Sequence, residues 1–242
     1  MNLKLGRKYP TKAKLKLSKY LGPALPTPPP ACDWTLAMTD VWGMMGNDQL
    51  GDCTCAAMGH AVQIVTSNGD GLITPVDAEI IKMYESSGYS PSDPSSDQGW
   101  TETAAMQYMV TSGLSNVKAD AFADVDQNNR KELLQTVKLM GGAYLGVSIT
   151  QDDMDQFKAG TPWTSTDMSN VLGGHAIWMP RYDDLGIYVI TWGQLQHATW
   201  DWYAAHCDEA HAMLFLPWVR NTCGLDPDGF DYDTLHADLA SL

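Results

Sequence analysis

The chain has 242 residues, of which 44% are hydrophobic, and its 15 Lys and Arg against 29 Asp and Glu give a formal net charge of −14. This content is enough to bury a core, which excludes a wholly disordered chain, and the acidic balance argues against binding of the whole surface to nucleic acid or an anionic membrane. No stretch reaches the ~18 consecutive apolar residues of a membrane helix, and the lysine-rich start lacks the apolar core of a signal peptide. We therefore expect a soluble protein that is not exported and that occupies the cytoplasm.

The five cysteines do not form the pattern of a disulfide framework. Their number is odd in a chain of ordinary size, so at least one thiol is unpaired. A reducing compartment or a reactive thiol fits this pattern better than a secreted protein held by disulfides. The cysteines are residues 32, 53, 55, 207 and 223.

The basic residues are concentrated in an N-terminal arm. The first acidic residue is Asp33, and residues 33–242 contain all 29 acidic residues. Prolines between residues 23 and 30 favour extended geometry, which predicts a semi-rigid spacer or strap. We therefore divide the chain into the arm, residues 1–31, and one folded domain, residues 32–242. The basic residues of the arm are Lys4, Arg7, Lys8, Lys12, Lys14, Lys16 and Lys19.

Two interpretations of this arm are open. In the first, the arm is a disordered tail or folds back on its own acidic body. In the second, it docks on a partner, which would be an acidic protein surface or, less favoured by the overall charge, nucleic acid.

Helices are predicted first along the chain and strands second. Apolar spacing and terminal residues predict helices over Cys53 to Thr66, Thr74 to Tyr84, Thr101 to Ser112 and Asn129 to Met140. Short runs of aromatic and aliphatic residues predict strands over Ala143 to Ile149, Ala176 to Tyr182, Ile187 to Trp192 and Ala212 to Leu216. This order is typical of an α+β domain with an antiparallel sheet.

Two thiols stand at the start of the first predicted helix, where Gly51-Asp52 is expected to supply the cap. At a helix N-terminus the unsatisfied N–H groups and the helix dipole stabilise an anion, so the pKa of Cys53 or Cys55 is expected to be lowered. A thiolate also needs a proton acceptor, and His175 follows two glycines that allow close approach of the backbone.

At these residues the chain resembles the papain-like cysteine peptidase superfamily. The resemblance implies an α+β papain-like fold, with an N-terminal helical half packed on a C-terminal antiparallel sheet, a Cys-His pair and a tryptophan that shields the His. The motifs that carry it, in order, are Asp33-Trp34, the Asn/Gln-rich turn before Cys53, Gly99 to Leu114, Gly141-Gly142-Ala143, His175-Ala176-Ile177 and Thr191-Trp192-Gly193.

A narrower resemblance is to uncharacterised papain-like proteins of bacterial and phage genomes, whose Gly-Asn-Asp-x-x-Gly-Asp-Cys signature is Gly46 to Cys53 here. It implies either a hydrolase acting on a peptide or isopeptide-like substrate, or a catalytically inactive structural protein of a phage particle. In the second case the arm, residues 1–31, would tether the acidic body to a capsid or other virion protein, and the protein would be located in the virion.

The resemblance leaves the nucleophile ambiguous. Papain-type enzymes place an oxyanion Gln six residues before the nucleophile, and this spacing is satisfied by Asn47 with Cys53 and by Gln49 with Cys55. We favour Cys53, because the first helical turn exposes more unpaired N–H groups. Asn47 would then donate to the oxyanion.

The third member of the family's triad is missing. The position of the Asn that orients the His falls on Ile190, and Thr191 stands where other relatives have an Asp. Neither side chain carries a carboxylate, so the site is expected to be weak or inactive unless Asp183 or Asp184 substitutes from a loop.

No cofactor or metal is expected. One conceivable ligand set is Cys53, Cys55 and His60, and the other is His206, Cys207 and His211. Structural zinc sites use paired ligands at tighter and repeated spacings than either set offers.

Overall fold

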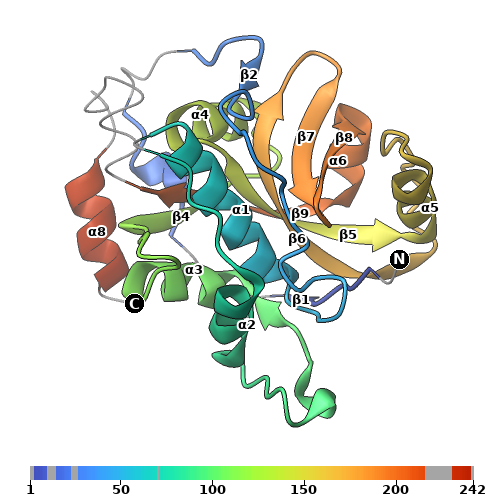
Figure 1. The fold of residues 1–242 in the computed structure, drawn as a ribbon. Helices are drawn as coiled ribbons and strands as arrows, with labels where there is room; N and C mark the ends of the chain where they lie inside the picture. The colour runs from blue at the N-terminus through green and yellow to red at the C-terminus, as the bar shows by residue number, and fades with distance from the viewer. Residues whose placement is uncertain (1–2, 10–14, 23–26, 70, 216–230, 241–242) are drawn as a thin grey trace.

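The helical half of the fold is built around one central helix. The computed structural model describes residues 3–9, 15–22, 27–69, 71–215 and 231–240, and Figure 1 shows the helices of this half on one side of a sheet. Its helices are α1 (Cys53–Ser67), α2 (Asp77–Glu85) and α3 (Glu102–Thr111).

The second half is an antiparallel sheet in the strand order β4-β9-β5-β6-β7-β8, with β2 paired to β6. The long strand β6 is central, because it pairs with β5 on one side and β7 on the other. The strands are β2 (Cys32–Asp33), β4 (Ala121–Val125), β5 (Ala143–Thr150), β6 (Val171–Tyr182), β7 (Gly186–Thr191), β8 (Gln194–Thr199) and β9 (Cys207–Leu214).

Further helices flank the sheet, and two short strands lie apart from it. None of the helices in the described parts of the chain has the length and hydropathy to span a bilayer. These elements are α4 (Arg130–Met140), α5 (Gln151–Ala159), α6 (Trp200–His206), α8 (Tyr232–Ala240), β1 (Arg7–Lys8) and β3 (Trp100–Thr101), with short 3-10 helices at Leu17–Lys19 and Pro94–Ser96.

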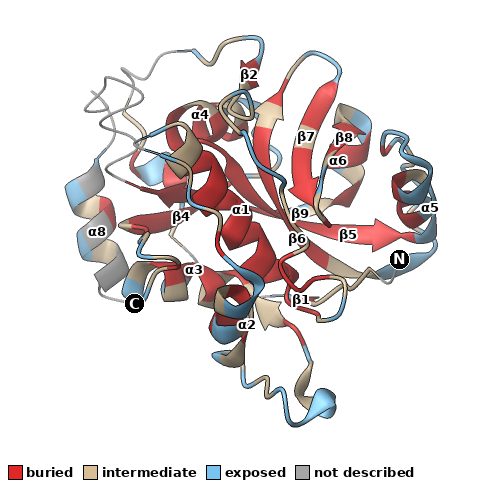
Figure 2. Cartoon of the chain, viewed as in Figure 1, coloured by how far each residue is buried: buried red, intermediate tan, exposed pale blue. Residues whose placement is uncertain are grey.

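Helix α1 is buried along almost its whole length, as the red ribbon in Figure 2 shows. Small residues allow other elements to approach it closely. A Cβ at Gly59 would lie 2.3 Å from the sulfur of Met45 and 2.8 Å from Cδ1 of Ile80. Because α1 packs against β6 on one side and α2 and α3 on the other, it joins the two halves of the fold.

The four helices predicted from sequence are confirmed as α1 to α4, with ends shifted by a few residues. The four predicted strands are confirmed as β5, β6, β7 and β9, but β6 and β9 both begin earlier, and Leu216 lies outside the described residues. Sequence analysis did not predict β4, β8, α5, α6 or α8. Strand β8 has the sequence QLQHAT and so offers little hydrophobic signal; it is held by its pairing with β7.

The described parts of the arm lie against the domain. Strand β1 pairs with β3, Leu17 and Tyr20 are buried in the core, and the Lys19 ammonium lies 2.6 Å from the carboxylate of Asp238. Residues 10–14 and 23–26 of the arm are outside the described residues. This placement agrees with an arm that folds back on its own acidic body. The division at residue 31 stays a prediction.

Candidate functional site

The N-terminal end of α1 is fixed by a buried polar turn. The N–H of Gly51 donates to Oδ1 of Asp97 at 3.0 Å, and the hydroxyl of Tyr84 donates to the same oxygen at 2.7 Å. Asp52 occupies the N-cap position, but its side chain makes no capping hydrogen bond, contrary to the sequence-based expectation. Burial raises the pKa of Asp52 well above its usual value. An ionised carboxylate at this depth would be costly, which explains the direction.

Cys53 and Cys55 occupy different faces of α1. Two residues correspond to about 200° of rotation around a helix, so their side chains point in nearly opposite directions. Backbone groups of Ala176, the residue after His175, and of Gly6 in the arm act on the thiol of Cys53 and lower its pKa. The thiol of Cys55 instead lies 4.0 Å from the hydroxyl of Thr54. The fold therefore brings Cys53, and not Cys55, to the backbone of the strand that bears His175.

Cys53 is only 1% exposed. Burial raises the pKa of Cys53 to about 12; the backbone hydrogen bonds from Ala176 and Gly6 act in the opposite direction, and the charge of Asp52 adds to the rise. The sequence-based expectation of a lowered thiol pKa is therefore wrong for this arrangement. The physical reason is that desolvation by burial outweighs the helix N-terminus.

His175 is held by a hydroxyl group. Its Nε2 lies 2.6 Å from Oγ1 of Thr191, and its Nδ1 has no hydrogen-bond partner among the described residues. Sequence analysis expected no carboxylate at Thr191, and the structure shows its neutral hydroxyl as the partner of His175. Asp183, named as a substitute, instead accepts a hydrogen bond from the hydroxyl of Tyr188 at 2.9 Å.

Trp192 covers the imidazole. The two rings stack with centroids 4.2 Å apart and an interplanar angle of 17°. Trp192 has a φ of 43°, in the left-handed region that bulky residues rarely adopt. Its indole N–H donates to the carbonyl of Lys4 at 3.2 Å, and its ring packs edge-on against Phe157 at 5.0 Å. These contacts hold the strained residue in place over His175.

His175 is neutral in this arrangement. Burial, followed by the charge of Arg7, lowers the pKa of His175 to about 3. Since the thiol of Cys53 is also protonated, the two groups do not form an ion pair while the arm is in place.

Asn47 and Gln49 differ sharply in their surroundings. Asn47 is buried, its Nδ2 donates to the carbonyl of Leu50 at 3.0 Å, and its own carbonyl accepts from the N–H of Lys4 at 3.2 Å. Gln49 is exposed, so the alternative pairing of Gln49 with Cys55 gains no support. Asn47 therefore uses one amide hydrogen to hold the turn before α1, and its oxyanion role stays a prediction.

The arm crosses the site at Gly6, and Figure 1 shows β1 beside the N-terminal end of α1. The carbonyl of Gly6 accepts from the N–H of Trp100 at 2.9 Å. A Cβ at Gly6 would lie 1.8 Å from the carbonyl oxygen of Gly51, and a Cβ at Gly99 would lie 1.8 Å from the carbonyl oxygen of Gly6. Only glycines allow backbones to meet this closely. The arm therefore fits tightly against the turn that precedes Cys53.

Arg7 is buried beside the covered thiol. Its Nη1 lies 2.5 Å from Glu209, its Nη2 lies 2.5 Å and 2.7 Å from the two carboxylate oxygens of Asp208, and its Nε lies 3.9 Å from Glu102. We call the place that this guanidinium fills, bounded by Glu102, Gly146, Asp208 and Glu209, the Arg7 site. Sequence analysis did not identify it, because its members are far apart in the chain and carry no local pattern.

His211 lies behind the Arg7 site. Its Nε2 is 3.0 Å from Glu102 and 3.3 Å from Glu209, and its Nδ1 is 2.9 Å from Asp124. Burial alone would lower the pKa of His211, but hydrogen bonds to these carboxylates outweigh it and raise the pKa to about 10. His211 and Arg7 are therefore two buried cations that balance this carboxylate cluster.

Neither metal-ligand set considered from the sequence comes together in the part of the chain that the structure describes. Within those residues, Glu102, Glu209 and His211 alone form a group of three potential ligands within 4.8 Å of one another. The guanidinium of Arg7 already contacts this group through Glu209.

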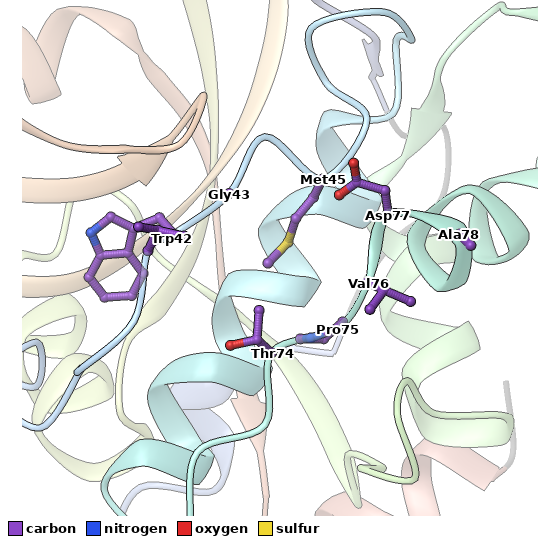
Figure 3. Close-up of a pocket in the computed structure, with 9 residues that line it drawn as sticks. Trp42, Gly43, Met45, Thr74, Pro75, Val76, Asp77 and Ala78 are labelled. Atoms are coloured by element: carbon purple, nitrogen blue, oxygen red, sulfur yellow. The ribbon is translucent and has the colours of Figure 1, made fainter.

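A separate hollow of about 480 Å³ lies in the helical half, between the loop before α1 and the start of α2 (Figure 3). It contains none of the candidate residues and brings no Cys or His to its wall. Its lining residues are Val41, Trp42, Gly43, Met45, Thr74, Pro75, Val76, Asp77 and Ala78.

Comparison with known proteins places this geometry in a structural class. No family model and no curated protein matches the chain. Among solved structures, xylellain, a cysteine protease from Xylella fastidiosa, matches with a TM-score of 0.67 and 12% identity over 89% of this chain and 97% of that one. A procathepsin B of Trypanosoma congolense matches with a TM-score of 0.62 and 10% identity over 87% and 85%. A Carica candamarcensis cysteine protease matches with a TM-score of 0.55 and 16% identity over 77% and 98%.

The chain therefore has the papain-like fold. Its N-terminal helices pack on an antiparallel sheet, and the proteins that it resembles in structure are papain-like cysteine proteases. The predicted fold class is confirmed. At these identities the likeness establishes the fold, and function has to be argued from the site.

Proposed function

We propose that the protein is a papain-fold cysteine hydrolase that acts on peptide or isopeptide-like bonds, with Cys53 as nucleophile and His175 as proton acceptor. The observation that carries the proposal is the state of His175. Thr191 fixes Nε2, Trp192 covers the ring, and Nδ1 is left without a described partner. The effect of the Ala176 backbone on the pKa of Cys53 supports a thiol close to this His-bearing segment.

The proposed chemistry uses the imidazole as both base and acid. With its hydrogen on Nε2, His175 donates to Thr191 and offers the lone pair of Nδ1. Nδ1 takes the thiol proton as the sulfur of Cys53 attacks the carbonyl carbon, and it gives that proton to the leaving amine as the thioester forms. Water then adds to the thioester and releases the acid and the thiol. N–H groups of the first turn of α1, with the amide of Asn47, would stabilise the oxyanion.

Thr191 limits the expected rate. A hydroxyl fixes the ring angle and the tautomer but carries no negative charge to stabilise the imidazolium. Loss of the carboxylate from a serine-protease triad lowers kcat by about 10⁴-fold. We therefore expect slower turnover than a carboxylate at this position would allow.

The arm has to leave before a substrate can enter. Gly6 of the arm lies against the turn before Cys53, since a Cβ there would lie 1.8 Å from the carbonyl oxygen of Gly51. Its carbonyl accepts from the N–H of Trp100 at 2.9 Å. The arm thus occupies the space next to the first turn of α1 that a substrate would need.

Alkylation kinetics test the proposal. Gly6→Ala should expel the arm, because the added Cβ would overlap the carbonyl of Gly51. In this variant we expect iodoacetamide to modify Cys53 at neutral pH much faster than Cys55, and His175→Ala in the same background to slow the reaction. Peptide mapping by mass spectrometry distinguishes the two thiols. Equal modification of both cysteines, with no effect of His175→Ala, would refute the assignment.

The alternative is a papain-like protein without catalysis. The hydroxyl of Thr191 in place of a carboxylate favours it. It predicts that the Gly6→Ala variant cleaves no peptide and that its Cys53 reacts like an ordinary thiol. A tether to a virion through residues 1–31 gains no support from the described arm residues, since these pack on the protein's own domain.

A further inference from the structure

We propose that the Arg7 site is a recognition site for a basic side chain, so that the protein acts on peptides that carry arginine next to the residue lying at Cys53. The substrate preference rests on the proposed hydrolase function. Binding of a basic side chain at the Arg7 site does not depend on catalysis. Arg7 of the arm would then be an internal occupant that a substrate's arginine replaces.

The Arg7 site adjoins the covered thiol. In the sheet, Gly146 of β5 pairs with Glu209 of β9 on one side and with Ala176 of β6 on the other. Ala176 is also the residue whose backbone lowers the pKa of the Cys53 thiol. A side chain bound on Gly146 therefore lies one strand spacing, about 4.8 Å, from Ala176. Arg7, which directly follows Gly6 in the arm, has its guanidinium on Gly146.

The floor of the site is shaped for a long side chain. A Cβ at Gly146 would lie 2.5 Å from Nη1 and 2.7 Å from Cζ of Arg7, so any other residue would close the space that the guanidinium fills. A Cβ at Gly174 would lie 2.8 Å from the carbonyl oxygen of Arg7. Together the two glycines let an extended backbone lie on the sheet with its side chain directed to the carboxylates.

The charge of the site calls for a cation. Glu102 is fully buried and Glu209 nearly so, and leaving such carboxylates without a counter-charge is strongly unfavourable. His211 contacts both of them through Nε2. A basic side chain is attracted to these carboxylates, as Arg7 is, whereas an acidic one would be repelled by them.

The geometry favours arginine over lysine. Nη1 and Nη2 of Arg7 reach two different carboxylates, Glu209 and Asp208, at the same time. A planar guanidinium spans such a pair with a fixed fork, while an ammonium is a single point of charge. We therefore expect arginine to be preferred at this position.

Chemical rescue tests the site without any catalytic readout. Arg7→Ala in the full chain should empty the site, and millimolar ethylguanidinium should then raise the Tm by about 2–4 °C. Neutral ethylurea should have no such effect. The matched control is Arg7→Ala with Glu209→Gln, in which the rise should disappear. No rise in Arg7→Ala, or an equal rise with ethylurea or in the control, would overturn the proposal.

A second measurement covers the case in which Arg7→Ala does not fold. Gly6→Ala with Cys53→Ala frees the site with its carboxylates intact, and fluorescence anisotropy can follow binding of a labelled Leu3–Tyr9 peptide. We expect at least about tenfold tighter binding than for the same peptide with citrulline in place of arginine, as one lost charged contact implies. Equal affinities would overturn the proposal.

Turnover separates this inference from the proposed function. In Gly6→Ala, peptides with arginine or citrulline are compared as substrates at each position. Selective binding of arginine with no cleavage of any peptide would support the Arg7 site and refute the hydrolase. Cleavage with no preference for arginine would support the hydrolase and refute the site.

Discussion

The hydroxyl of Thr191 lies 2.6 Å from Nε2 of His175, sixteen residues away along the chain at the end of the neighbouring strand. The contact spans the last residue of β7 and the His-bearing part of β6. It leaves only Nδ1 to accept a proton, which fixes which side of the ring would serve a thiol.

Replacement of Thr191 by valine should lower activity without unfolding the protein. The shape is kept, but the hydrogen bond to His175 is lost, so we expect kcat/KM in the Gly6→Ala background to fall about 3–10-fold, the usual worth of one such bond. Thr191→Ser keeps the hydroxyl and should retain most of the activity. Steady-state kinetics on one peptide measure both variants, and equal activity of all three proteins would show that the contact is not used.

Arg7 should control access to Cys53. Arg7→Ala removes the ion pairs with Asp208 and Glu209 that hold the arm, so alkylation of Cys53 by iodoacetamide should become at least about tenfold faster. Lys8→Ala is the matched control, because Lys8 is the next basic residue and is exposed. Mass spectrometry gives the rate at Cys53 in each protein. Equal acceleration by the two substitutions would contradict this role for Arg7.

The sequence was sufficient to predict those helices and site residues that are marked by a pattern of neighbouring residues. The helices α1, α3 and α4 were predictable because apolar spacing and terminal glycines mark them. Cys53 was singled out as a thiol in a first helical turn, and His175 as a residue after two glycines that permit close approach. The structure shows such a close approach of two backbones, since a Cβ at Gly174 would lie 2.8 Å from the carbonyl oxygen of Arg7.

The sequence was insufficient where partners are distant. The composition showed a basic arm, but nothing local distinguishes Arg7, which is buried, from Lys8, which is exposed. The carboxylates that receive Arg7 lie about two hundred residues further on, at Asp208 and Glu209. For the same reason the direction of the pKa of Cys53 was mispredicted: a helix N-terminus is visible in a sequence, whereas burial of the thiol in the folded protein is not.

Stability should fall at high pH because of His211. Its pKa is raised from 6.5 to about 10 in the folded state, so its contribution is fully present below pH 6.5 and is lost as the pH rises through about 10. We expect the free energy of unfolding by urea to decrease by on the order of a few kcal/mol between these values. His211→Gln should flatten this slope, and an unchanged slope in the variant would show that other groups cause it.

The packing of α1 against Met45 and against Ile80 of α2 should tolerate no added methyl group at Gly59. Alanine there would place Cβ 2.3 Å from the sulfur of Met45 and 2.8 Å from Ile80, and such overpacking typically costs about 1–3 kcal/mol. Met45→Ala removes the flexible side chain that meets the new methyl group, so Gly59→Ala should cost less in that background than in the wild-type chain. A double-mutant cycle by urea denaturation measures this coupling. Strictly additive losses would mean that the methyl group is accommodated elsewhere, by a shift of α1 or of α2 that leaves Met45 in place.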